Sequence, residues 1–171
     1  MLAAALAAAA VTAAVGAAAQ PAGGWSTYHD PKAGFSIQTP IDAKIYHLPL
    51  PTKMGWAPSV IGSVKLENKA GLLFSASDYS GLKVSSDPNV VLENGVKDAV
   101  AQSHAALDSE QSISVGGAPG RDIVVHSQKG GARARLVYRD RQMYLLVGVG
   151  PLGDGPPREY ERFAGSLAFD H

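Results

Sequence analysis

The sequence contains no cysteine among its 171 residues. Disulfide bonds, thiolate zinc sites, thiol nucleophiles and dithiol redox motifs are therefore excluded. A chain of this length can bury a substantial hydrophobic core without cross-links. We therefore expect the packing of that core to hold the fold by itself.

The chain also lacks an excess of either charge, since Lys and Arg together number 15 and so do Asp and Glu. Nucleic-acid-binding domains usually carry a strong basic excess, so we expect no nucleic-acid partner. Aromatic residues make up only 7% of the chain, which does not favour a surface for stacking bases.

Motifs for metals, nucleophiles and nucleotides are missing as well. None of the five histidines has the spacing of a motif such as His-Glu-x-x-His, and no Gly-x-Ser-x-Gly occurs. Gly148, Gly150 and Gly153 match the letters of a dinucleotide fingerprint, but Pro151 interrupts the place where a helix must begin. We expect no metal and no cofactor, and a hydrolase whose site assembles from distant residues stays open as an alternative.

An apolar stretch opens the chain. Residues 1–19 hold no charge and no proline, and they end in Ala17-Ala18-Ala19 directly before Gln20. This composition predicts a signal peptide at 1–19, although the basic residue that usually opens a signal is missing. A membrane anchor is less favoured because alanine is only weakly hydrophobic, and a disordered alanine tract is the other alternative. We expect a periplasmic or secreted protein with no stable membrane span after cleavage.

Residues 20–171 have the length of a single domain. Alternating apolar and polar residues predict strands at 35–39, 59–67, 72–79, 111–115, 121–128, 132–139 and 143–149, with a short strand at 167–169. Prolines interrupt residues 41–58, which we expect to be an irregular excursion with at most a short strand at 43–47.

A helical pattern separates the early strands from the late ones. Asp87 and Pro88 form a typical helix start, and apolar residues then recur at helical spacing to Leu107, so we predict a helix over 88–107. A second, short helix is expected after Pro157. This order predicts an α+β domain built on a largely antiparallel β-sheet that is flanked by helices.

Three arginines form a candidate anion-binding site. Arg133, Arg135 and Arg139 have the same parity in the predicted strand 132–139, which places them on one face of the sheet. Guanidinium groups bind carboxylates and phosphates through paired hydrogen bonds. The simpler interpretation is a solvated sheet face whose arginines pair with Asp122 or with other acidic residues of this chain.

The proline-rich excursion is the second candidate site. Leu50, Met54 and Trp56 are large apolar residues between prolines. Such residues in a loop are either buried against the core or used in contact with a partner. We therefore consider both a partner surface and a segment that folds back over the core.

Short motifs near both ends of residues 20–171 carry a family resemblance. They are Trp25-x-x-Tyr28, Asp30-Pro31, Gly34-Phe35-Ser36-Ile37-x-x-Pro40 and Arg162-Phe163-x-x-Ser166-Leu167. With these motifs the chain resembles PsbP-like domains and similar small exported bacterial domains. The resemblance implies an α/β/α sandwich and a binding or accessory role without catalytic residues. Residues 41–58 depart from the family's pattern, and nothing photosynthetic is implied.

These observations favour a non-enzymatic envelope protein that binds another envelope protein or stabilises an assembly. A small-ligand or anion-binding protein that uses the arginines is the alternative, and an unrecognised hydrolase is the third.

Overall fold

The computed structural model describes residues 24–66, 69–151 and 155–170. The expected signal peptide, residues 1–19, lies outside the described residues. Among the described residues, no helix is long and apolar enough to cross a membrane.

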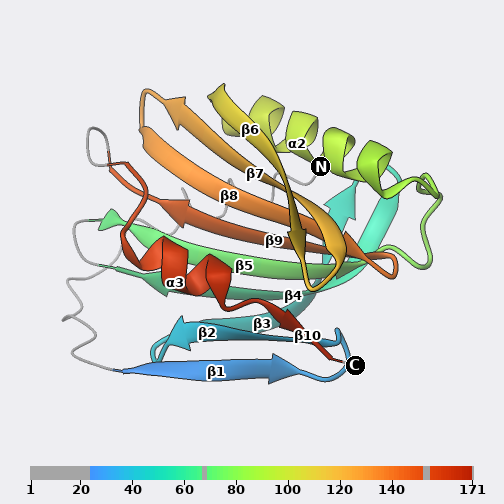
Figure 1. Cartoon of the computed structure of the whole chain (residues 1–171), viewed down its shortest axis with the longest axis horizontal. Coiled ribbons are helices and arrows are strands. Elements are labelled where there is room, and N and C mark those ends of the chain that lie inside the picture. The colour runs from blue at the N-terminus through green and yellow to red at the C-terminus, as the bar shows by residue number, and fades with distance from the viewer. Residues whose placement is uncertain (1–23, 67–68, 152–154, 171) are drawn as a thin grey trace.

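Two antiparallel sheets and two helices make up the described fold (Figure 1). The large sheet has the strand order β3-β4-β5-β9-β8-β7-β6, and the small sheet has the order β1-β2-β10. The bounds are β1 Trp25–Asp30, β2 Phe35–Pro40, β3 Lys44–Thr52, β4 Gly55–Lys65, β5 Gly71–Asp78, α2 Pro88–Ser103, β6 Ala106–Val115, β7 Ala118–Ser127, β8 Gly130–Arg139, β9 Gln142–Val149, α3 Glu159–Gly165 and β10 Ala168–Phe169.

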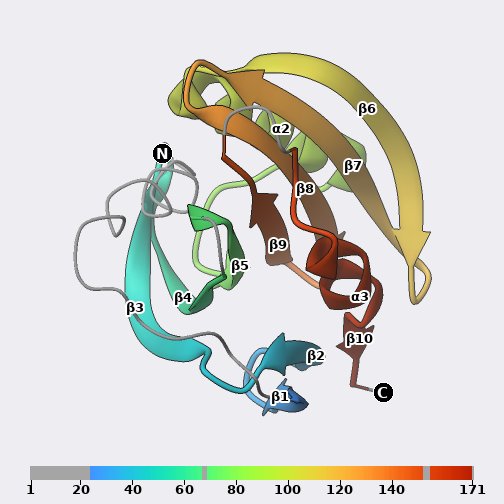
Figure 2. The same cartoon turned by 90° about the vertical axis from the view of Figure 1, so that its left-hand side faces the viewer.

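The large sheet lies between two covering layers. Helix α2 packs on one face, mainly over β7 and β8, while α3 and the small sheet cover the other face (Figure 2). Each interface has its own buried apolar cluster. Leu92 of α2 packs with Leu136 of the sheet, and Phe35 of β2 and Phe163 of α3 lie in the same cluster as Phe74 of the sheet. The predicted α+β class and the α/β/α sandwich are both confirmed.

Helix α2 begins where the sequence predicts. The Asp87 carboxylate accepts a hydrogen bond from the backbone N–H of Asn89 at 2.8 Å, and Pro88 occupies the first turn. The helix ends at Ser103, however, because His104 adopts a left-handed conformation with φ of 49°. The predicted end at Leu107 is therefore wrong, since Leu107 lies in β6 and only continues the apolar spacing by coincidence.

The proline-rich segment forms a regular hairpin instead of an irregular excursion. Strands β3 and β4 pair continuously from Lys44–Ser63 to Thr52–Gly55. Pro49 and Pro51 are tolerated because β3 is an edge strand, where a missing N–H need not face a neighbour. Pro58 faces Pro49 just before the pairing of β4 with β5 begins. The prolines therefore shape the hairpin without breaking its pairing.

Tyr144 links the large sheet to the small one. Its hydroxyl group donates a hydrogen bond of 2.8 Å to the carbonyl of Ala33 in the β1–β2 turn. Burial raises the pKa of Tyr144 from its ordinary value of 10.0 to about 12. The folded state thus disfavours the phenolate, and the contribution of Tyr144 to stability is complete below pH 10 and is lost as the pH rises towards 12.

We expect the free energy of unfolding to fall as the pH rises above about 10. Tyr144→Phe removes both the hydrogen bond and the ionisation, so it should lower stability by about 1 kcal/mol at pH 7. Its stability should then fall less steeply than that of the wild type between pH 10 and 12. Urea midpoints measured across this range test the prediction, and parallel curves for the two proteins would contradict it.

Candidate protein-binding surface

The free end of the β3–β4 hairpin carries an exposed apolar surface. Cross-strand pairs share a face of a sheet, and the pairs Pro49–Pro58 and Pro51–Trp56 are consecutive on one face. Trp56 is 66% exposed, and Met54 in the adjacent turn is 47% exposed. We call these five residues, Pro49, Pro51, Met54, Trp56 and Pro58, the Trp56 surface.

Local contacts hold the hairpin end in one conformation. The Thr52 hydroxyl donates to the Gly55 carbonyl at 2.8 Å and accepts from the Met54 N–H at 3.1 Å. Lys53 forms an ion pair with Asp98 of α2, which ties the turn to that helix. Prolines fix the backbone further because their φ angle is restricted. The Trp56 surface is therefore presented by an ordered element.

The structure separates the three residues that the sequence places in a partner surface. Leu50 is only 8% exposed and pairs with Ala57, which belongs to the core under α2. Because Leu50 has the opposite parity to Pro49 and Pro51, it points to the opposite face. It belongs to the core and must be removed from the candidate surface. Met54 and Trp56 stay, joined by three prolines whose role the sequence did not suggest.

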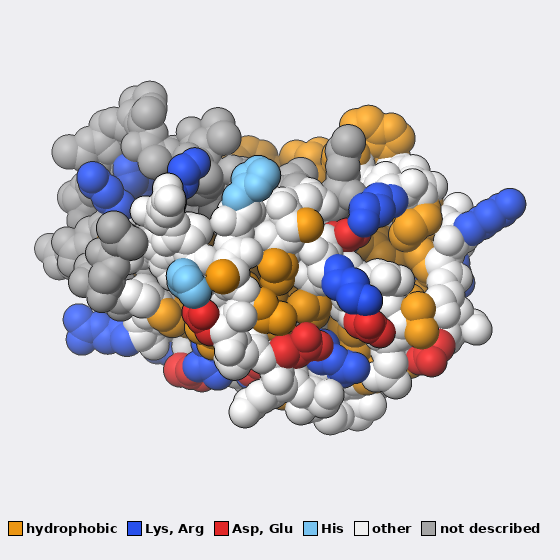
Figure 3. Space-filling model, turned by 90° about the horizontal axis from the view of Figure 1, so that it is seen from above, with side chains coloured by type: hydrophobic (Ala, Val, Ile, Leu, Met, Phe, Trp, Pro, Cys, Tyr) orange, Lys and Arg blue, Asp and Glu red, His pale blue; other side chains and the backbone are white. Residues whose placement is uncertain are grey.

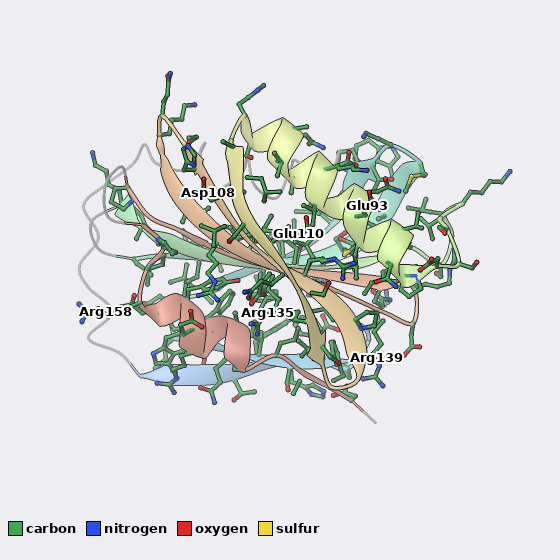
Figure 4. All side chains as sticks on the ribbon, turned by 45° about the horizontal axis from the view of Figure 1, so that its top comes forward. Glu93, Asp108, Glu110, Arg135, Arg139 and Arg158 are labelled. Carbon is green, nitrogen blue, oxygen red and sulfur yellow. The ribbon has the colours of Figure 1, made fainter. Side chains whose placement is uncertain are left out.

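The candidate arginines lie on one face of β8, as predicted, but their guanidinium groups contact the chain itself. Arg135 binds the buried Asp122 carboxylate through two hydrogen bonds of 2.8 Å each, and it donates a third of 2.9 Å to the Ala164 carbonyl. Figure 4 shows Arg135 between the sheet and α3. The hydrogen bond with Asp122 raises the pKa of Arg135 further. This face is covered by α3 and is not the solvated face that we expected, although the predicted Asp122 partner is confirmed.

The other two arginines are also engaged. Arg133 forms an ion pair with Glu161 of α3, and Arg139 donates to Asp140 at 3.1 Å while its guanidinium lies 5.0 Å from the centre of the Phe169 ring. A shallow open depression lies near the β6–β7 and β8–β9 turns, but of the three candidate arginines only Arg139 lines it. These contacts do not favour anion binding at Arg133, Arg135 and Arg139.

Two histidine–carboxylate pairs bear on the hydrolase alternative. His29 pairs with Asp170 at 3.0 Å and His126 with Asp108 at 2.6 Å, and all four side chains are exposed. Within the described residues, no serine forms a hydrogen bond with either histidine, and no cluster of three or more His, Asp or Glu side chains could hold a metal ion. Nothing in this geometry favours a serine nucleophile.

The chain has a PsbP-like fold. It superposes on the solution structure of cyanobacterial PsbP (CyanoP) from Synechocystis sp. PCC 6803 with a TM-score of 0.58 and 14% sequence identity, over 90% of this chain and 98% of that one. PA94 from Pseudomonas aeruginosa, a protein of unknown function, superposes with a TM-score of 0.40 and 13% identity, over 77% of this chain and 86% of that one. No family model matches the chain, and a search of curated proteins finds no match. The resemblance suggested by the terminal motifs is thus confirmed at the level of the fold.

Proposed function

We propose that this chain is an exported, non-catalytic module that binds another envelope protein through the Trp56 surface. The observation that carries the proposal is the 66% exposed Trp56 on an ordered hairpin, flanked by prolines on the same face. Export is supported by the apolar residues 1–19 and their Ala17–Ala19 end. The PsbP-like fold is compatible with an accessory role.

The chemistry of the Trp56 surface suits a protein partner. Tryptophan provides a large apolar area with an N–H donor, and it is enriched among the residues that dominate binding energies. Lys53, the charged residue of the turn, is already paired with Asp98. A rigid hairpin also loses little conformational entropy when it binds. We therefore expect the partner to offer an apolar pocket or groove for Trp56.

Capture experiments with the full chain test this proposal. We expect a periplasmic extract to yield a specific protein with the wild type, and we expect Trp56→Ala to weaken its binding about 30-fold or more, as for a dominant interface residue. The free energy of unfolding should change by less than about 0.5 kcal/mol, because Trp56 is exposed. Titration of the purified partner gives the two affinities.

Tyr46→Ala is the matched control. Tyr46 is 48% exposed on the same hairpin but pairs with Ile61 on the opposite face. Its replacement should leave the affinity within about twofold of the wild type. The proposal would be wrong if no protein were captured specifically, or if both variants bound as tightly as the wild type.

A further inference from the structure

Strand β6 forms an open edge of the large sheet. Among the described strands it pairs only with β7, and most of its residues are exposed. Every second residue of such a strand turns its N–H and C=O groups away from the sheet. A second β-strand can form hydrogen bonds with all of these alternating N–H and C=O groups. The partner expected at this edge is therefore a β-strand.

The two edges of the sheet differ in their capacity to accept a strand. At the opposite edge, β3 carries Pro49 and Pro51, which lack N–H groups and obstruct further pairing. Strand β6 contains neither proline nor lysine. Pairing of β6 with β3 of another copy would use two different edges and would extend into an open filament. The prolines of β3 oppose that pairing. Pairing of β6 with β6 of a second copy uses the same edge twice and gives a closed dimer.

We propose that β6 pairs antiparallel with β6 of a second copy of this chain, which joins two large sheets into one. A two-fold axis perpendicular to the sheet relates the copies, so the same surface is used twice. This proposal does not depend on the function proposed for the Trp56 surface.

A β-bulge sets the register of the pairing. The β6–β7 register shifts between Leu107 and Ser109, and bulges increase the local twist of a strand. The regular part of β6 is therefore 109–115, with Ser112 at its midpoint. Pairing over this full length places Ser112 opposite Ser112 of the second copy and Glu110 opposite Ser114.

The charges of β6 are compatible with this register. Glu110 pairs with Arg121 at 3.2 Å and Asp108 with His126 at 2.6 Å, so both acidic groups already have partners in their own chain. Figure 4 labels Asp108 and Glu110, which both belong to β6, and the view from above in Figure 3 shows acidic and basic side chains close together. The formal net charge is zero. Neither like-charged side chains nor a large net charge therefore opposes association of two copies.

The absence of cysteine makes cross-linking a direct test of the register. In the full-length protein, Ser112→Cys places two thiols opposite each other, where Cα atoms about 4.5–5.5 Å apart suit a disulfide. Ser114→Cys is the matched control, because Ser114 is an exposed serine on the same strand and face. In the proposed register its two copies lie about 14 Å apart, too far for a disulfide.

We expect mild oxidation to convert most Ser112→Cys protein to a covalent dimer and to leave Ser114→Cys at least fivefold less cross-linked. Equal cross-linking of the two variants, or none in either, would overturn the proposed register. Both variants should retain the wild-type circular dichroism spectrum.

The sedimentation of Ser112→Glu tests the interface without a cross-link. Within one chain Ser112 faces Arg121, so the introduced carboxylate gains an opposite charge and the monomer should fold normally. In the dimer two introduced carboxylates face each other and repel. We expect the wild type to sediment as a dimer at tens of micromolar and the dissociation constant of Ser112→Glu to rise at least tenfold. A monomeric wild type, or a variant that dimerises equally well, would overturn the proposal.

Discussion

Replacing Arg135 with methionine should destabilise the protein by about 3–5 kcal/mol. Asp122 is buried, and Arg135 supplies both of its hydrogen bonds of 2.8 Å. Methionine fills a similar volume but leaves the carboxylate without this partner, which is the costly way to break a buried ion pair. Arg133 lies 3.7 Å from the same carboxylate and replaces the lost contact only in part. At roughly 2–4 °C per kcal/mol, the melting temperature should fall by about 10 °C.

The position of Arg135 adds a second, local effect. Arg135 also donates to the carbonyl of Ala164, so it links β8 to the last turn of α3. We expect the backbone amides of α3 to exchange with solvent faster in Arg135→Met, even at temperatures where the sheet remains folded. Hydrogen exchange measured by mass spectrometry on peptides from 159–166 follows this change.

Two controls separate the buried pair from a general effect of lost charge. Arg139→Met removes an arginine from the same strand whose acidic partner, Asp140, is exposed, and it should cost less than about 1 kcal/mol. Asp122→Leu combined with Arg135→Met removes both charges and should recover most of the stability. Equal losses for the two single arginine variants would show that the Asp122 pair is not the stabilising feature.

The sequence predicts elements correctly where local signals determine them. Asp87 and Pro88 specify the start of α2 because a side-chain cap and a restricted φ act within one turn. The end of α2 depends on a left-handed His104, and no glycine marks that position. The apolar Leu107 then continues the helical spacing although it lies in a strand. The alternation of apolar and polar residues similarly identifies strands. The residues at which each strand begins and ends depend on neighbouring strands elsewhere in the chain.

The proline-rich hairpin and the arginines show what local patterns do not determine. Prolines usually interrupt strands, but their effect depends on whether the strand is an edge, and strand order is a tertiary property. Parity correctly places Arg133, Arg135 and Arg139 on one face. The covering of that face by α3, and the resulting contact of Arg135 with Ala164, involve residues 29 positions apart in the chain. The same limit applies to Leu50, which shares the core-facing side of the hairpin with its partner Ala57 and is buried there.

Gly62→Ala should destabilise the protein by about 3 kcal/mol, although it adds a single methyl group. Gly62 in β4 faces Phe74 in β5, and a Cβ atom at this position would lie 2.0 Å from the Phe74 Cε1 atom. The aromatic ring therefore occupies the space that a side chain would fill. Adding atoms to a packed core typically costs about 1–3 kcal/mol, and we expect the upper end of this range because the ring itself must move.

The surroundings of Phe74 explain why its displacement is costly. Its ring centre lies 5.4 Å from that of Tyr28, 5.8 Å from that of Phe35 and 6.4 Å from that of Phe163. These rings come from β1, β2 and α3, so Phe74 contacts every main element that covers this face of the large sheet. Moving it should weaken all of these contacts together and reduce the near-ultraviolet circular dichroism of the aromatic side chains.

Three further variants test whether the contact with Phe74 causes the loss: Gly81→Ala, Phe74→Leu and Phe74→Leu combined with Gly62→Ala. Gly81→Ala adds a methyl group where no atom lies within 4 Å of the new Cβ, and it should leave stability unchanged within about 0.5 kcal/mol. Phe74→Leu combined with Gly62→Ala should cost less than the sum of the two single changes, because the smaller side chain leaves room for the methyl group. Urea denaturation of the wild type, Gly62→Ala, Phe74→Leu and the double variant gives the coupling energy between the two positions. Strict additivity would mean that the methyl group is accommodated by a shift of the backbone and that the ring stays in place.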